Sequence, residues 1–176
     1  MHAVLSQKKQ EVVALLIQSL TAQNKDVEKC LNAHYVLAEL SDNENTYGKL
    51  VEKDNLTMII RAACDINNEH NSIYALNIII RVIKEFPDYE KKIGSLANEF
   101  TQTIGNHFLD LTYSCLIFIR HTSPSEELEF NQAGFAQRKF GFRRFKALEL
   151  IKQELQTLSK YVELNSDHYI SHILRK

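Results

Sequence analysis

Glycine and proline are scarce in this chain, with five glycines and two prolines among 176 residues. Glycine loosens a regular backbone, whereas proline fixes φ and removes a hydrogen-bond donor, so both residues tend to interrupt helices. The strict alternation of apolar and polar residues that is typical of strands is missing, as are glycine-rich turns. We therefore predict an all-α chain whose helices run with few interruptions.

The sequence also lacks a long apolar run and a disulfide pattern. Its most apolar stretch, residues 111–119 (LTYSCLIFI), is much shorter than the roughly 20 residues of a membrane-spanning helix. The three cysteines, Cys30, Cys64 and Cys115, are odd in number and far apart, which predicts reduced, buried thiols. We expect a cytosolic or nuclear protein.

Neither sign of charge dominates the chain. A formal net charge of -1 gives no overall attraction to nucleic acid or to an anionic membrane, so any electrostatic recognition must come from a local patch. With 44% hydrophobic and 24% charged residues, the composition is that of a globular protein, and the length matches one domain. We predict a single helical-repeat domain over residues 1–176.

Motifs that carry catalysis are absent from the sequence. It has no glycine-rich phosphate loop, no G-x-S-x-G elbow and no H-E-x-x-H helix. His168 and His172 would share a helix face beside Asp167, but no third and fourth metal ligand accompanies them, so we interpret them as solvated histidines. We expect no enzyme activity and no cofactor.

What the chain does contain is apolar residues at helical spacing. A proline at position 87 should end one helix, and Gly105 should divide two others. In the last long helix, Phe142, Phe145, Leu148 and Ile151 form the clearest stripe, and we expect it to face the core. The predicted helices span about 3–22, 26–40, 55–66, 72–86, 88–103, 106–120, 141–162 and 167–174, with a loop or short helix start at 41–48 and a short helix or turn at 124–131.

An internal similarity suggests how these helices are arranged. Residues 30–40 (CLNAHYVLAEL) align with 75–86 (ALNIIIRVIKEF) at a shift that pairs Leu31 with Leu76 and Asn32 with Asn77. Such spacing is typical of stacked helical repeats, in which each helix pair leaves an apolar face for its neighbour. We predict an armadillo-like or HEAT-like α-solenoid of about seven to nine helices, with an irregular helical bundle as the alternative.

The aligned asparagines are candidate partner-binding residues. On the inner helix of an armadillo-type repeat, an asparagine such as Asn32 or Asn77 holds the backbone of an extended peptide. The alternative is a buried amide that bonds a neighbouring loop, because buried polar groups need hydrogen-bond partners.

A second candidate is the basic stretch 135–151 (FAQRKFGFRRFKALELI), in which Arg138, Lys139, Arg143, Arg144 and Lys146 alternate with phenylalanines. Cations in the first turn of a helix oppose its dipole, so negative groups should lie nearby. Glu126, Glu127 and Glu129 of the same chain are one source, an acidic protein partner is a second, and nucleic acid is a third.

Three segments resemble a known family in the same order: 26–40 (DVEKCLNAHYVLAEL), 50–83 (LVEKDNLTMIIRAACDINNEHNSIYALNIIIRVI) and 140–151 (FGFRRFKALELI). They are similar to the armadillo-like core of the SAPS-domain proteins, regulatory subunits of protein phosphatase 6. The positions that match the family pattern are Asn32, Ala33, Leu37, Gly141, Arg144, Phe145, Leu150 and Ile151.

The resemblance implies a non-catalytic scaffold that holds a phosphatase catalytic subunit. We therefore expect a protein-binding scaffold or regulatory subunit of a larger complex. The alternative is a nucleic-acid-associated helical protein that uses residues 138–146.

Overall fold

The computed structural model describes residues 2–21, 26–120, 128–130, 133, 136–138, 141–154 and 156, with the backbone alone for 2–10, 128–130 and 136–138. These residues form seven helices and one short hairpin, so the predicted all-α fold class is confirmed. The elements are α1 (His2–Thr21), α2 (Val27–Leu40), α3 (Glu44–Val51), α4 (Lys53–Ala63), α5 (Glu69–Tyr89), α6 (Leu96–Arg120), β1 (Leu128–Phe130), β2 (Ala136–Arg138) and α7 (Phe142–Gln153).

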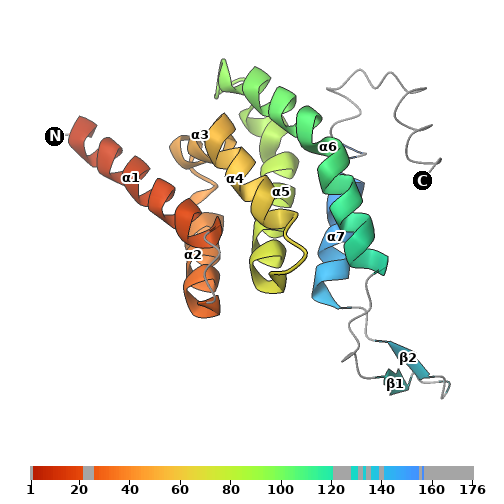
Figure 1. Cartoon of the computed structure of the whole chain (residues 1–176). Helices are drawn as coiled ribbons and strands as arrows, with labels where there is room; N and C mark the ends of the chain where they lie inside the picture. Colours follow the sequence, from red (N-terminus) through yellow and green to blue (C-terminus); the bar gives the residue numbers. More distant parts are fainter. Residues whose placement is uncertain are drawn as a thin grey trace.

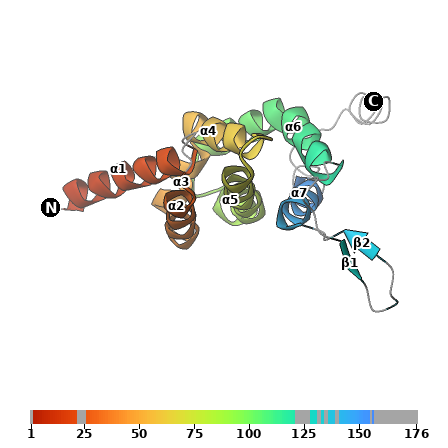
Figure 2. The ribbon, with the colours of Figure 1, turned by 60° about the horizontal axis from the view of Figure 1, so that its bottom comes forward.

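Six of the helices lie in two layers (Figures 1 and 2). One layer contains α1, α4 and α6, and the other contains α2, α5 and α7. Between the layers, α1 packs on α2, α4 on α5 and α6 on α7, and we call these pair one, pair two and pair three. Pair two contacts both of the others, because α4 lies between α1 and α6 while α5 lies between α2 and α7.

The central helix α5 holds the layers together. Its apolar residues occupy more than one face, and these faces are covered by neighbouring helices. At its end, the ring of Phe86 stacks on Phe100 of α6 with centroids 4.4 Å apart. The fully or almost fully buried apolar residues of this helix are Ala75, Leu76, Ile78, Ile79, Ile80, Val82, Ile83 and Phe86.

Short helix α3 is fastened to α5 by Tyr47. This side chain is fully buried, its hydroxyl donates a hydrogen bond of 2.8 Å to the Val82 carbonyl, and its ring stacks on Tyr89. Asn43 caps the start of α3 by accepting from the Asn45 amide. The segment 41–48, predicted as a loop or helix start, therefore leads into a packed helix.

Two predicted breaks are wrong, at Pro87 and at Gly105. Helix α5 continues through Pro87 to Tyr89, and the next helix begins at Leu96 rather than near Asp88. Burial of Phe86 outweighs the local preference against a helix before proline. Helix α6 runs unbroken through Gly105. A glycine inside a helix costs about 1 kcal/mol of stability, and the burial of Ile104 and Leu111 in the same helix offsets this cost.

The short helix or turn predicted at 124–131 is wrong for residues 128–130, which form strand β1. This strand pairs antiparallel with β2, with Leu128 opposite Arg138 and Phe130 opposite Ala136. The hairpin lies apart from the helical layers (Figures 1 and 2). The predicted helix 167–174 lies outside the described residues.

The Tyr47 hydroxyl should contribute to stability. We expect Tyr47→Phe to lower the free energy of unfolding by about 1 kcal/mol, because the buried hydrogen bond to Val82 is lost while the ring stays packed. Urea denaturation measures this change. Tyr113→Phe, at an exposed position of α6, is the matched control and should change stability by less than about 0.5 kcal/mol.

Candidate protein-binding surface

The outer side of the layer α2, α5 and α7 carries a connected group of aromatic and polar side chains. At its centre, His34 of α2 is only 8% exposed. Its Nε2 lies 2.8 Å from Asn77 Nδ2 of α5, and its ring stacks on Tyr74, also of α5, at 5.2 Å. The more exposed Tyr35 lies beside it, with the ring centroids 5.5 Å apart. Asn77 therefore forms the bond to a neighbouring helix that the sequence offered as the structural alternative.

The bond to Asn77 determines the protonation of His34. Because the amide nitrogen of Asn77 donates, Nε2 accepts and the neutral ring carries its proton on Nδ1. Burial lowers the pKa of His34, and the positive charges of Lys146 and Arg81 lower it further. The ring is thus neutral at pH 7, and it holds Asn77 in one orientation at the junction between pair one and pair two.

Helix α7 extends this group beyond α5. Lys146 Nζ lies 5.4 Å from the ring centroid of Phe142 and 5.7 Å from that of Phe145, and it forms an ion pair of 2.8 Å with Glu149. Because α7 and α2 both pack on α5, these side chains belong to the same layer of helices as Tyr74 and Asn77. We call these residues the three-helix surface: Tyr35, Tyr74, Asn77, Phe142, Phe145 and Lys146.

The prediction that Phe142, Phe145 and Leu148 face the core is wrong. All three are exposed, Phe142 at 58%, and the buried side of α7 instead contains Arg144, Ala147 and Leu150. Small Ala147 allows α7 to approach both α5 and α6 closely, and an arginine covers apolar neighbours with its aliphatic stem. The side of α7 with the largest apolar residues is therefore exposed, and a different side of the helix packs against α5 and α6.

Arg143 clamps pair three to pair two. Its Nη2 donates to the carbonyl oxygens of Asp65 and Ile66, at 3.3 and 3.1 Å, and its guanidinium carbon lies 3.8 Å from the ring centroid of Phe118. The carboxylates of Asp65 and Glu69 also act on it electrostatically. The two carbonyl oxygens, which follow the end of α4, carry partial negative charge and so offset the cation at the start of α7.

The cations of the basic stretch differ in their surroundings. Arg143 is bound within the chain, and Arg144 is 8% exposed. Of the remaining cations, Lys146 belongs to the three-helix surface, Arg138 is described only by its backbone in β2, and Lys139 lies outside the described residues. The suggested partners Glu126 and Glu127 also lie outside them, and Glu129 is described only by its backbone.

Asn32 does not share a surface with Asn77. It is exposed on α2, two residues from His34, and residues two apart on a helix point about 200° apart. His34 faces α5, so Asn32 faces away from it. The position on α2 that meets Asn77 is His34, which no sequence motif singled out. The only indication of this site within the sequence was that Tyr74 and Asn77, three residues apart, share a helix face.

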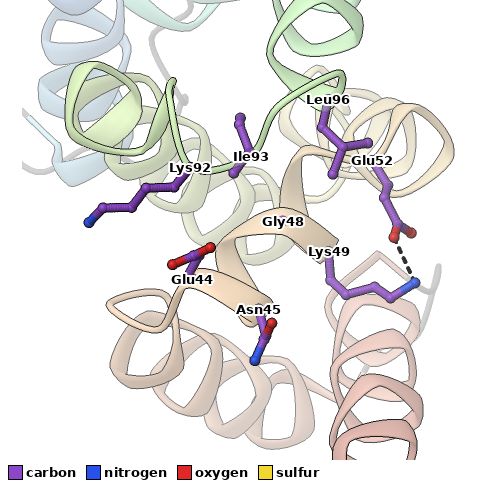
Figure 3. A pocket seen from close by; sticks show the side chains of 8 residues that line it. All are labelled: Glu44, Asn45, Gly48, Lys49, Glu52, Lys92, Ile93 and Leu96. Carbon is purple, nitrogen blue, oxygen red and sulfur yellow. Dashed lines mark ion pairs between the residues drawn. The ribbon is translucent and has the colours of Figure 1, made fainter.

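A shallow pocket lies where α3 meets the segment that precedes α6 (Figure 3). Charges of both signs line it: Glu44 and Glu52 against Lys49 and Lys92, with Lys49 and Glu52 paired at 2.6 Å. No serine, threonine, cysteine or histidine is among its eight lining residues. In the described part of the chain no three His, Cys, Asp or Glu residues are grouped as metal ligands, and none of the described helices is long and apolar enough to cross a membrane.

Glu154 is a buried carboxyl group, 2% exposed, at the end of α7. Burial raises its pKa to about 8, and the nearby Thr112 hydroxyl offsets only part of that shift. Glu154 Oε1 has no hydrogen-bond partner among the described residues. Neighbouring Cys64 and Cys115 are free thiols whose pKa values are also raised by burial, which makes them poor nucleophiles.

Comparisons with protein-family models, with curated proteins and with solved structures found no match.

Replacement of Arg143 should weaken the junction between pair two and pair three. We expect Arg143→Ala to lower the free energy of unfolding by about 2 to 3 kcal/mol, because two bonds to carbonyl groups and the contact with Phe118 are lost. Arg143→Lys should recover only part of this loss, since lysine lacks the planar fork. Lys152→Ala, an exposed cation on the same helix, is the control for urea denaturation. If Arg143→Ala were as stable as the control, Arg143 would not stabilise the junction between pair two and pair three.

Glu154 should make stability depend on pH. Its folded pKa is above the unfolded value, so the folded state binds more protons and loses stability as pH rises from about 4.5 to about 8. The stability of Glu154→Gln relative to wild type should therefore increase by about 3 to 5 kcal/mol between pH 5 and pH 8. Chemical denaturation at a series of pH values measures it, with exposed Glu39→Gln as the control. If the difference in unfolding free energy between Glu154→Gln and wild type stayed constant from pH 5 to pH 8, the raised pKa of Glu154 would be refuted.

Proposed function

We propose that this chain is a non-catalytic protein-binding scaffold or regulatory subunit, built as a segment of an armadillo-like or HEAT-like α-solenoid. The supporting observation for the architecture is the order of contacts, in which α4 lies between α1 and α6 and α5 lies between α2 and α7. Consecutive helix pairs of a solenoid contact each other in this way, so that one layer of helices forms a continuous binding face.

The observation that carries the binding function is the three-helix surface. Tyr35, Phe142 and Phe145 are each more than half exposed on one layer, and aromatic residues are enriched at protein interfaces. Asn77 and Lys146 add polar groups between them. His34 holds Asn77 in place, so little conformational entropy is lost when a partner binds it.

This arrangement suits an extended segment of a partner protein. Such a segment would cross α2, α5 and α7 in turn, place apolar side chains on the exposed rings and meet the Asn77 amide with its backbone. The resemblance to SAPS-domain proteins makes a phosphatase catalytic subunit the first partner to test.

Nucleic-acid binding through residues 138–146 receives less support. Two of its five cations, Arg143 and Arg144, are engaged or buried within the helical layers, and Lys146 is paired with Glu149. Nucleic-acid affinity depends on cations that remain free to neutralise phosphates.

A double variant tests the proposal. Tyr35→Ala with Phe142→Ala should weaken capture of a protein partner by about tenfold or more, because each removes an exposed aromatic anchor. Its melting temperature should stay unchanged, since both positions are exposed. Quantitative affinity purification, followed by titration with the purified partner, measures the effect.

Val36→Ala is the matched control, because Val36 is also exposed on α2 but points in a different direction from Tyr35. It should bind like wild type. The proposal is rejected if the double variant binds its partner as tightly as wild type does. It is also rejected if nuclease treatment removes the captured material, because that material would then be held through nucleic acid.

A further inference from the structure

The bond between His34 and Asn77 determines which atom the Asn77 amide offers to a partner. Asn77 Nδ2 donates to His34 Nε2 at 2.8 Å, so Asn77 Oδ1 is directed away from the ring. Asn77 is only half-buried, and no other described residue bonds its Oδ1. At neutral pH, Asn77 therefore presents a hydrogen-bond acceptor on the three-helix surface.

The His34 ring cannot take up a second proton in this arrangement without losing hydrogen bonding. The neutral ring carries its proton on Nδ1, which is buried and has no hydrogen-bond partner among the described residues. A proton on Nε2 would face the N–H groups of Asn77, so that two donors would meet. A protonated His34 would thus have two buried donors and no acceptor, which costs free energy.

Rotation of the Asn77 amide relieves this repulsion with the least movement. A half-turn about its Cβ–Cγ bond exchanges the positions of Oδ1 and Nδ2, which places an acceptor opposite His34 Nε2 without moving either helix. The ring itself is held, because it is 8% exposed and stacks on Tyr74 with the centroids 5.2 Å apart. The reversed amide directs its N–H groups, rather than its oxygen, away from the ring.

We propose that His34 and Asn77 form a proton-operated switch in the three-helix surface. When His34 binds a proton, the Asn77 amide reverses and its acceptor on the surface is replaced by a donor. A partner segment whose backbone N–H bonds Asn77 Oδ1 is then released. The release rests on the proposed function, whereas the reversal of the amide is a property of this chain alone.

The groups around His34 determine the pH at which the switch acts. Burial lowers the pKa of His34 below the ordinary value of 6.5, and two cations lower it further. No carboxylate bonds His34 in the described part of the chain, and the cations have carboxylate partners of their own. From α1, whose side chains are described from residue 11 onward, only exposed Glu11 is titratable. The ionisable side chains around His34 on α2, α5 and α7 are Cys30, Tyr35, Tyr74, Arg81 and Lys146.

Nitrogen NMR of the 15N-labelled full chain tests the reversal without a partner. From about pH 7.5 to about pH 4.5, the ring nitrogens of His34 should titrate with a lower midpoint than those of exposed His70. At neutral pH, Nδ1 of His34 should carry the proton. The side-chain amide signals of Asn77 should shift with the midpoint of His34, and those of exposed Asn32 should not.

Two variants relate these signals to the His34–Asn77 bond. Asn77→Asp keeps the shape of the side chain but offers an acceptor in either orientation, so it should raise the midpoint of His34 by about 1 pH unit or more. His34→Gln cannot bind a proton in this range and should abolish the pH-dependent shift of the Asn77 signals. His70→Gln, which replaces an exposed histidine, is the control and should retain this shift.

Titration with the partner purified on the wild-type chain tests the release. Between about pH 7 and about pH 5, the Kd should rise by about fivefold or more for wild type and for His70→Gln. It should change less for His34→Gln. Each ratio is taken within one variant, so any loss of affinity that His34→Gln causes at neutral pH does not affect the comparison.

Three NMR results would overturn the inference: a His34 whose Nδ1 is unprotonated at neutral pH, Asn77 signals that do not follow His34, or a chain that unfolds before His34 titrates. A Kd with the same pH dependence in wild type and His34→Gln would overturn the release. If the double variant of Tyr35 and Phe142 bound like wild type, the proposed binding site would be rejected while the NMR results stayed unchanged. The two proposals therefore fail separately.

Discussion

The constraint on which this structure depends is that one pair of helices cannot cover its own apolar residues. Helix α5 is the extreme case, because residues such as Ile79, Ile80 and Val82 occupy too wide an arc to be covered by α4 alone. Pair one and pair three cover the remainder. Stacking of the pairs is therefore driven by apolar burial, and it leaves the ends of the stack and one side of each layer for other interactions.

Polar contacts at the two junctions add orientation to this packing. Between pair one and pair two, His34 bonds Asn77, and between pair two and pair three, Arg143 binds the carbonyl groups of Asp65 and Ile66. Apolar contacts tolerate some sliding, whereas hydrogen bonds require particular distances and angles. The junctions thus place Tyr35, Tyr74 and Phe142 relative to one another, which connects the stability of the stack to the geometry of the proposed binding surface.

Much of the helical structure was predictable, because its causes are local. Asp26 caps α2 by accepting from the Lys29 amide, and α2 nearly coincides with the helix predicted over residues 26–40. A helix over residues 72–86 was also predicted, from apolar residues at helical spacing, and it lies within α5. The errors at Pro87 and Gly105 have one cause: local preferences of about 3 kcal/mol for proline and about 1 kcal/mol for glycine were outweighed by the burial of large side chains nearby.

The candidate site was less predictable. By itself the sequence determined that α7 is a helix with apolar residues at regular spacing, because hydrogen bonding and periodicity depend on near neighbours along the chain. Only the tertiary structure decided that Arg144 and Ala147 face inward and that Phe142 faces outward, because this depends on how closely α5 and α6 approach. The meeting of His34 with Asn77 joins residues of two different pairs. Such contacts are products of packing across the chain and leave no pattern within either segment.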